Sequence, residues 1–124
     1  MTPKILETYK AFDIVVVPFP FTDSSQTKRR PALVLSSHKN FNNEISHSIL
    51  AMITSARNKP WPLDTIIEDY AAAGLPKACT IRMKFFTLDH RIIIRKIGTL
   101  ALKDQKTFRK MFLKLFQDLR KTSS

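Results

Sequence analysis

The hydrophobic pattern of the sequence changes at about residue 103. Before that point, apolar residues stand in short runs rich in valine and isoleucine, which polar and proline-containing segments separate. After it, large apolar residues recur at intervals of three and four, at Phe108, Met111, Phe112, Leu115, Phe116 and Leu119. The first pattern predicts β-strands, and the second predicts an amphipathic helix over about residues 103–120. We therefore expect a mainly β chain with a C-terminal helix.

The strand predictions follow from the β-branched runs. Strands are expected at residues 13–17, 32–36, 48–54 and 79–86, with a short one at 64–67 and a further apolar stretch at 92–100. Turns are expected at 38–44 and 87–90, a break at 58–62, and a helix-prone segment at 68–73 that Gly74 ends. Pro18 cannot donate to a ladder, so the chain should leave central pairing there. Short strands with polar loops, followed by one helix, favour a small, twisted, partly open β-barrel. The length fits one domain over residues 1–124.

The charge of the chain is strongly positive. Lys and Arg number 21 against 10 Asp and Glu, which gives a net charge of +11. Such a balance favours a polyanionic partner: nucleic acid first, an acidic protein second, an anionic membrane surface third. The basic residues cluster at 28–30, at Arg82 and Lys84, at 91–96 and along the expected C-terminal helix. Clustering is more typical of nucleic-acid binding than of a merely soluble surface.

Several functional classes are excluded by composition. Two glycines, Gly74 and Gly98, leave no glycine-rich phosphate loop or dinucleotide fingerprint. One cysteine, Cys79, allows no internal disulfide and no cysteine-based zinc site. The longest apolar run, residues 14–21, is too short to span a membrane, and the first residues lack a secretory h-region. We expect a soluble, cytoplasmic protein that is not bound to a membrane.

Catalytic residue types are sparse. The three histidines, His38, His47 and His90, show no ligand-like spacing, and Glu68 and Asp69 are too close in sequence to converge on one ion. We expect ordinary polar roles for the histidines, a packing role for Cys79, and neither metal nor cofactor. What remains is a polar loop with a basic end, residues 23–31, and the strand end at residues 53–55.

These two segments carry a resemblance to a known family. The string FDIVVVPFPFTDSSQTKRRPALVLS, residues 12–36, resembles the N-terminal signature of the MazF/PemK toxins. Further segments follow the family's order: residues 51–55, 74–77, 79–82, 86–89 and 97–100. The resemblance covers about residues 11–119. It implies a small SH3-like, CcdB-like β-barrel that acts as a homodimer.

The resemblance also implies an activity and a partner. It implies a toxin of a type II toxin–antitoxin system, a metal-independent, sequence-specific endoribonuclease that cuts single-stranded RNA. The family's two catalytic residues correspond to Arg30, before the second-strand proline, and Thr54, which closes the third strand. The implied partner is a cognate antitoxin whose acidic and apolar tail blocks the RNA groove.

The residue types suit RNA cleavage without a metal. The 2′-hydroxyl of RNA can attack the adjacent phosphorus, which leaves a 2′,3′-cyclic phosphate and a 5′-hydroxyl. Arg30 would stabilise charge on the phosphorane oxygens, and Thr54 would donate a hydrogen bond or orient the 2′-hydroxyl. Asp23 is a candidate base, with loop capping as its alternative role. Further RNA-binding candidates are Lys28, Arg29 and Arg82 for phosphates, Phe19 and Phe21 for stacking on bases, and Ser55 at the strand end.

Two other functions stay open at this level. A toxin of the same fold could inhibit DNA gyrase as CcdB does, through the end of the C-terminal helix and without Arg30 or Thr54. A basic barrel could also bind nucleic acid without cutting it. The pair of Arg30 and Thr54 favours the endoribonuclease.

Overall fold

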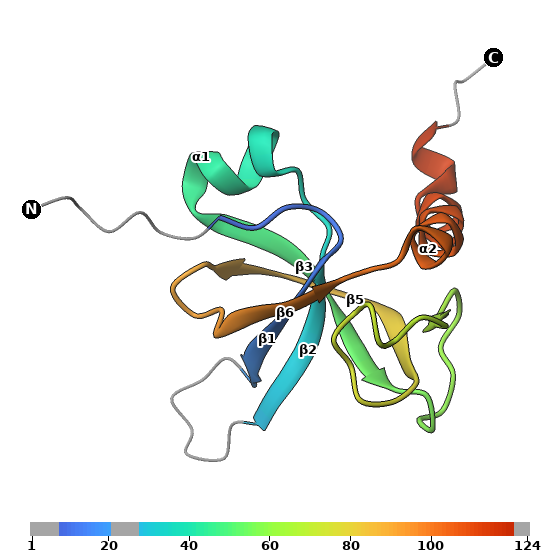
Figure 1. Ribbon diagram of the computed structural model, residues 1–124. Helices are drawn as coiled ribbons and strands as arrows, with labels where there is room; N and C mark the ends of the chain where they lie inside the picture. The colour runs from blue at the N-terminus through green and yellow to red at the C-terminus, as the bar shows by residue number, and fades with distance from the viewer. Residues whose placement is uncertain (1–7, 21–27, 121–124) are drawn as a thin grey trace, which may run out of the picture.

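The computed structural model describes residues 8–20 and 28–120, and its strands form one curled antiparallel sheet (Figure 1). The strands are β1 (Asp13–Phe19), β2 (Lys28–Val34), β3 (His47–Ser55), β4 (Thr65–Ile67), β5 (Cys79–Asp89) and β6 (Arg95–Thr99). Their order across the sheet is β4-β5-β3-β2-β1-β6. Helix α2 (Leu102–Leu115) follows, with a 3₁₀ turn at Gln117–Arg120. The prediction of a small, partly open β-barrel with a C-terminal helix is confirmed.

The valine-rich strands are buried on both faces because the sheet curls around itself. Ile14 packs with Leu33, Ile53, Ile81 and Phe108 in one apolar cluster. The next residue along β1, Val15, points the other way and packs in a second cluster, whose other members are Tyr9, Val17, Ala32, Val34, Leu50, Leu88 and Ile93. A strand covered on both sides reads as a continuous apolar run, which explains the sequence of β1.

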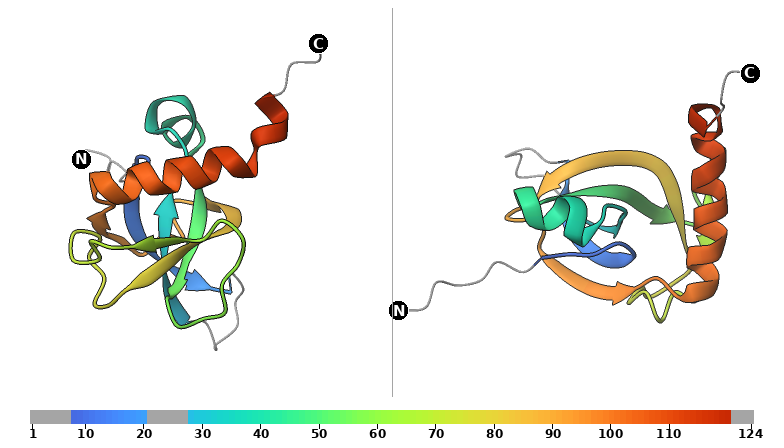
Figure 2. Two further views of the ribbon diagram at one scale, coloured as in Figure 1. Left: turned by 90° about the vertical axis from the view of Figure 1, so that its right-hand side faces the viewer. Right: turned by 90° about the horizontal axis from the view of Figure 1, so that it is seen from above.

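Helix α2 is fastened to the sheet at its N-terminal end. Phe108 lies in the core, and the buried carboxylate of Asp104 accepts hydrogen bonds from the backbone N–H groups of Glu68 and Asp69, at 3.1 and 2.9 Å. The last turns extend beyond the sheet (Figure 2). Leu113, Leu115 and Phe116 on these turns are exposed. The apolar stripe predicted from the sequence therefore packs in the core over its first half only.

Three local expectations were inaccurate. Residues 38–45 form a short helical segment, a π-helical turn at His38–Asn42 and α1 at Asn43–Ile45, where a turn was expected. Strand β5 runs on to Asp89 through the predicted turn at 87–90, because β3 pairs with it as far as His47. Residues 68–73 form turns and no helix; Asp104 accepts from the backbone N–H groups of Glu68 and Asp69, and the carbonyl oxygen of Ala72 accepts from the N–H of Thr99 in β6. Strand β1 continues through Pro18, and only β2 pairs with it there, so the prediction that the chain leaves central pairing at Pro18 is confirmed.

Gly74 and Gly98 meet at one contact between the segment after β4 and strand β6. A Cβ added to Gly74 would lie 2.0 Å from the carbonyl oxygen of Ile97, and one added to Gly98 would lie 2.4 Å from the carbonyl carbon of Ala73. Gly74 also has a φ of 75°, the left-handed region that glycine enters without strain. Both glycines are therefore needed for this segment to lie against β6.

Candidate functional site

Arg30 and Thr54 lie on two neighbouring strands, near the start of β2 and near the end of β3. Strands β2 and β3 pair antiparallel, and their last pair is Ala32 opposite Met52. Arg30 and Thr54 each lie two residues beyond this pair. Both side chains line two adjoining cavities.

The smaller cavity, called here the aromatic cavity, has a volume of about 210 Å³. Its lining consists of Phe19, Arg30, Met52, Ile53, Thr54, Asn58, Trp61, Arg82 and Lys84. The ammonium of Lys84 lies 5.2 Å from the centre of the Phe19 ring, and the guanidinium of Arg82 lies 4.9 Å from that of Trp61. Aromatic faces beside cations are surfaces on which nucleobases stack.

The larger cavity, called here the basic cavity, has a volume of about 390 Å³. Its cationic lining residues are Arg29, Arg30, Lys77 and Arg95. Its apolar lining includes Val16, Ile53, Leu75 and Ile97. No acidic residue of the described chain lines it. The arrangement suits an anion that also carries apolar surface.

Arg82 lies at the site, but its guanidinium already has partners. It donates to Asp64 Oδ2 at 3.0 Å and to the carbonyl oxygen of Lys59 at 2.8 Å. Asp64 in turn accepts from the backbone N–H of Trp61 at 2.9 Å. Both charged side chains are mostly buried, at 12% and 13% exposure. Arg82 therefore fastens the segment between β3 and β4 over the aromatic cavity, and its binding of phosphate stays a prediction.

The other predicted site residues are placed as follows. Ser55 lines the basic cavity, and its hydroxyl accepts a hydrogen bond from the N–H of Arg57 at 3.3 Å. Arg29 lines the same cavity, whereas Lys28, opposite Phe19 at the start of β2, is exposed and lines neither. Phe21 and Asp23 lie outside the described residues.

Sequence analysis missed five residues that line the cavities. Asn58, Trp61 and Lys84 line the aromatic cavity, and Lys77 and Arg95 line the basic cavity. The basic clusters containing Lys84 and Arg95 were visible in the sequence, but nothing in it indicated where those side chains point. Asn58 and Trp61 lie in a segment expected only to break the chain.

Cys79 lies in the wall of the basic cavity as a packed, protonated thiol. Its side chain is buried, and its sulfur donates to the carbonyl oxygen of Lys77 at 3.4 Å. Burial raises the pKa of this thiol above its ordinary value, while the charge of Lys77 opposes that rise. The packing role predicted for Cys79 is confirmed.

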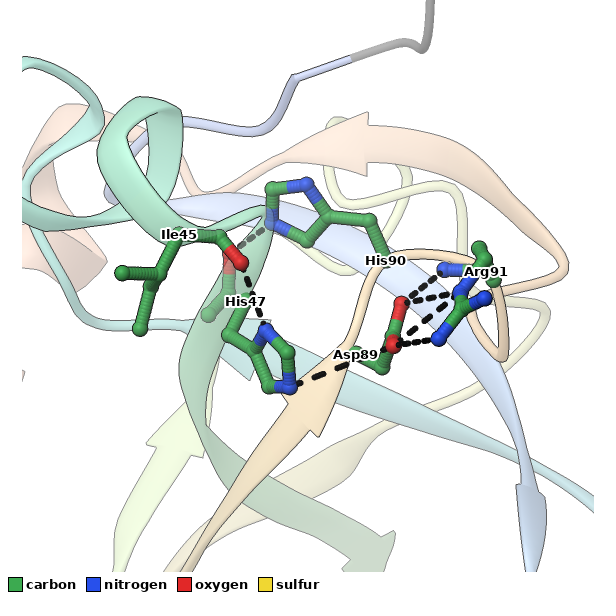
Figure 3. A network of polar contacts seen from close by, with 6 residues as sticks. Ile45, His47, Asp89, His90 and Arg91 are labelled. Carbon is green, nitrogen blue, oxygen red and sulfur yellow. Dashed lines mark hydrogen bonds and ion pairs between the residues drawn. The ribbon is translucent and has the colours of Figure 1, made fainter.

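None of the three histidines lines either cavity. Figure 3 shows His47 and His90 in a polar cluster with Asp89 and Arg91. His47 donates from Nδ1 to the carbonyl oxygen of Ile45 at 2.7 Å, and its Nε2 lies 4.0 Å from Asp89 Oδ2. Arg91 binds the same carboxylate at 2.7 Å and holds the pKa of Asp89 well below its usual range. His90 is buried, with Nε2 2.7 Å from the Ser48 hydroxyl, and burial lowers its pKa. This cluster connects β3 to the end of β5.

The structure is a small basic β-barrel in which Arg30 and Thr54 line two adjoining cavities. A model of the PemK-like, MazF-like toxins of type II toxin–antitoxin systems matches residues 10–116. The chain belongs to this family, whose members are generally endoribonucleases. The family resemblance seen in the sequence is thereby confirmed. A comparison with curated protein sequences gave no match.

Solved structures share the fold at low sequence identity. The Mycobacterium tuberculosis toxin MazF-mt6 is 17% identical, with a TM-score of 0.67 over 85% of this chain and 96% of the other. A MazE–MazF structure from Deinococcus radiodurans is 20% identical, with a TM-score of 0.71 over 90% and 98%. An endoribonuclease in complex with its cognate antitoxin, from a mycobacterial species, is 9% identical, with a TM-score of 0.68 over 89% and 94%. Within residues 8–20 and 28–120, no helix is long and apolar enough to cross a membrane.

Proposed function

We propose that this chain is a toxin that cuts single-stranded RNA at specific sequences, without a metal ion, with Arg30 and Thr54 as its catalytic residues. The observation that carries the proposal is that these two side chains, from neighbouring strands, line both cavities. An RNA strand that passes from one cavity to the other would cross the pair. The four cations around the basic cavity suit the phosphates of an RNA strand, and the aromatic rings of the aromatic cavity suit stacking of its bases.

The chemistry follows from RNA itself. The 2′-oxygen attacks the neighbouring phosphorus, a bond forms between them, and the bond from phosphorus to the 5′-oxygen breaks. The 2′-hydroxyl loses its proton, and the departing 5′-oxygen gains one, which gives a 2′,3′-cyclic phosphate and a 5′-hydroxyl. The guanidinium of Arg30 is always cationic and binds phosphorane oxygens in a fork. The hydroxyl of Thr54 donates a further hydrogen bond to these oxygens, whose charge is greatest in the transition state.

The proposed partner is a cognate antitoxin with an acidic and apolar tail, acting on a homodimer of this chain in the cytoplasm. Three of the fold neighbours are toxin–antitoxin complexes. The basic cavity combines cations with apolar surface, which also suits such a tail. The exposed apolar residues Leu113, Phe116 and Leu119 near the end of the described chain support a second copy as a packing partner.

The test is a cleavage assay on a long single-stranded RNA in excess EDTA. The purified protein is compared with Arg30→Ala and Thr54→Val, and with Arg120→Ala as a control for the loss of one exposed cation. We expect discrete fragments with 5′-hydroxyl ends from the parent protein and from the control, and none from the two site variants. Intact RNA that is bound with a steep salt dependence would instead indicate a binding barrel. Toxicity in cells that survives Arg30→Ala would indicate a gyrase inhibitor.

A further inference from the structure

The cations of this chain differ in whether a carboxylate neutralises them. Arg82, Arg91 and Lys96 each lie within 3.0 Å of an aspartate oxygen. The cations around the basic cavity, Arg29, Arg30, Lys77 and Arg95, form no ion pair with any described residue. Unpaired cations that converge on one concave surface make a positive potential there. The occupant of this cavity should therefore be an anion.

The volume and the lining of the basic cavity indicate which class of anion fits it. Its volume of about 390 Å³ falls within the range of about 300–1,000 Å³ of small-molecule sites. Its floor is apolar, with Ile53, Leu75 and Ile97, while its cations stand on the exposed rim. An apolar floor of this kind suits the flat ring and sugar of a nucleotide, and a cationic rim suits the phosphate at its edge.

The position of the cavity relates it to the reaction. Arg30 and Thr54 form the boundary shared with the aromatic cavity. Lys77 follows Gly74 on the segment that lies against β6, and Arg95 begins β6. These two cations therefore line the basic cavity from different elements than Arg30 and Thr54 do.

We propose that the two cavities hold consecutive nucleotides of the RNA, and that Lys77 and Arg95 bind the phosphate next to the one that is cut. This inference rests on the proposed function. The base of one nucleotide stacks in the aromatic cavity, and the other nucleotide lies on the apolar floor of the basic cavity. An acidic peptide would also contact cations and apolar surface in the basic cavity. The stacking surface of Phe19 and Trp61 in the adjoining aromatic cavity, however, favours nucleobases over such a peptide.

The experiment measures binding of an RNA that is 2′-deoxy at the cut position, so that binding is separated from cleavage. Neutral methylphosphonates replace the phosphates one at a time along this RNA. The protein variants are Lys77→Gln and Arg95→Gln, with Lys106→Gln and Lys110→Gln on the exposed face of α2 as matched controls. Circular dichroism confirms that each variant is folded.

We expect each cavity variant to weaken binding more than either control does. The plot of log affinity against log salt should be shallower by about 0.7 for each lost phosphate contact. A methylphosphonate at one position beside the cut should weaken binding by the parent protein as the variants do. On that neutralised RNA, Lys77→Gln and Arg95→Gln should cause no further loss.

Three results would overturn the inference. The Lys77→Gln and Arg95→Gln variants could bind RNA as tightly as the controls do. They could also lose as much affinity for the neutralised RNA as for the charged RNA. Alternatively, they could bind RNA normally and lose affinity for an acidic, apolar peptide, which would make the cavity a protein site. Cleavage of the all-ribose RNA is measured in parallel, so that a failure of the endoribonuclease proposal can be distinguished from a failure of the phosphate-site proposal. A protein that binds through Lys77 and Arg95 but never cuts would overturn the endoribonuclease and retain the phosphate site.

Discussion

The side-chain amide of Asn58 donates a hydrogen bond from Nδ2 to the hydroxyl oxygen of Thr54. The backbone N–H of Asn58 also donates to the carbonyl oxygen of Ser55 at 3.1 Å, which holds the amide beside the end of β3. Because the oxygen of Thr54 accepts this bond, its own proton is free to be donated to another group. Asn58 is thus a positioning residue that keeps the Thr54 hydroxyl a donor toward the space beside Arg30.

The first prediction concerns a variant that reverses the direction of the hydrogen bond between Asn58 and Thr54. Asn58→Asp keeps the shape but offers a carboxylate, to which Thr54 would donate its proton. We expect kcat for RNA cleavage to fall by about 10- to 100-fold, which corresponds to one hydrogen bond to a charged group. Asn40→Asp, at an exposed site on the helical segment before α1, controls for the added charge. An equal loss of kcat in Asn40→Asp would assign the effect to the added charge alone and would contradict the positioning role.

The second prediction concerns the ion pair that holds the segment over the aromatic cavity. Asp64→Ala leaves the mostly buried guanidinium of Arg82 without its carboxylate. We expect a loss of about 1–3 kcal/mol in the free energy of unfolding, between the values for exposed and fully buried pairs. Glu68→Ala breaks the exposed pair with Lys103 and should cost less than about 1 kcal/mol. Urea denaturation measures both, and equal losses would mean that the Arg82 pair adds no special stability.

The third prediction is a pH dependence of stability. Burial lowers the pKa of His90 below its ordinary value of 6.5, with the neighbouring charge of His47 adding to the shift. In the range below 6.5 the unfolded chain binds more protons than the folded one, so the free energy of unfolding should fall as pH decreases from 7 to 5. His90→Gln should flatten this fall.

Asp89 acts in a different range of pH. Its pKa is lowered by Arg91, so the stability that it adds is present above its unfolded pKa and is lost at more acidic pH. Denaturation curves at pH 7, 6 and 5 therefore isolate His90. An unchanged slope in His90→Gln would assign the pH dependence to other groups.

The fourth prediction concerns the contact between the two glycines. Gly74→Ala would bring its Cβ to 2.0 Å from a carbonyl oxygen and force an alanine into a left-handed conformation. We expect a loss of at least about 1–3 kcal/mol, and weaker RNA binding because the wall of the basic cavity moves. Ala71→Gly, on the exposed side of the same turn, should cost about 1 kcal/mol or less. Normal RNA affinity in Gly74→Ala would show that the wall can shift without consequence.

The strands were predictable because local periodicity reports burial directly. The β-branched run of residues 13–17 is a strand buried on both faces, and the stripe starting at Phe108 is a helix. The stripe could not show that Leu115 and Leu119 would be exposed, because a helical period says which residues share a face but not how far the neighbouring element reaches. The extension of β5 to Asp89 likewise depends on its pairing with β3, which is a non-local property.

The candidate site was predictable only where the chain carries a contiguous motif. Arg30 stands before Pro31, and Thr54 is the last residue but one of β3, so the family pattern named both. Lys77 and Arg95 are remote from that motif in sequence, and the curl of the sheet brings them to the same cavity. Asn58 and Trp61 reach the aromatic cavity through a loop whose path depends on the pair of Arg82 and Asp64.

The glycine contact has a consequence for redesign. The path of the cavity wall depends on two missing Cβ atoms, at Gly74 and Gly98, whereas the side chain of Lys77 that follows is exposed. Position 77 can therefore be randomised in a library while the backbone beneath it stays in place. A selection for toxins with new sequence preference would begin by varying residue 77 and leaving both glycines unchanged.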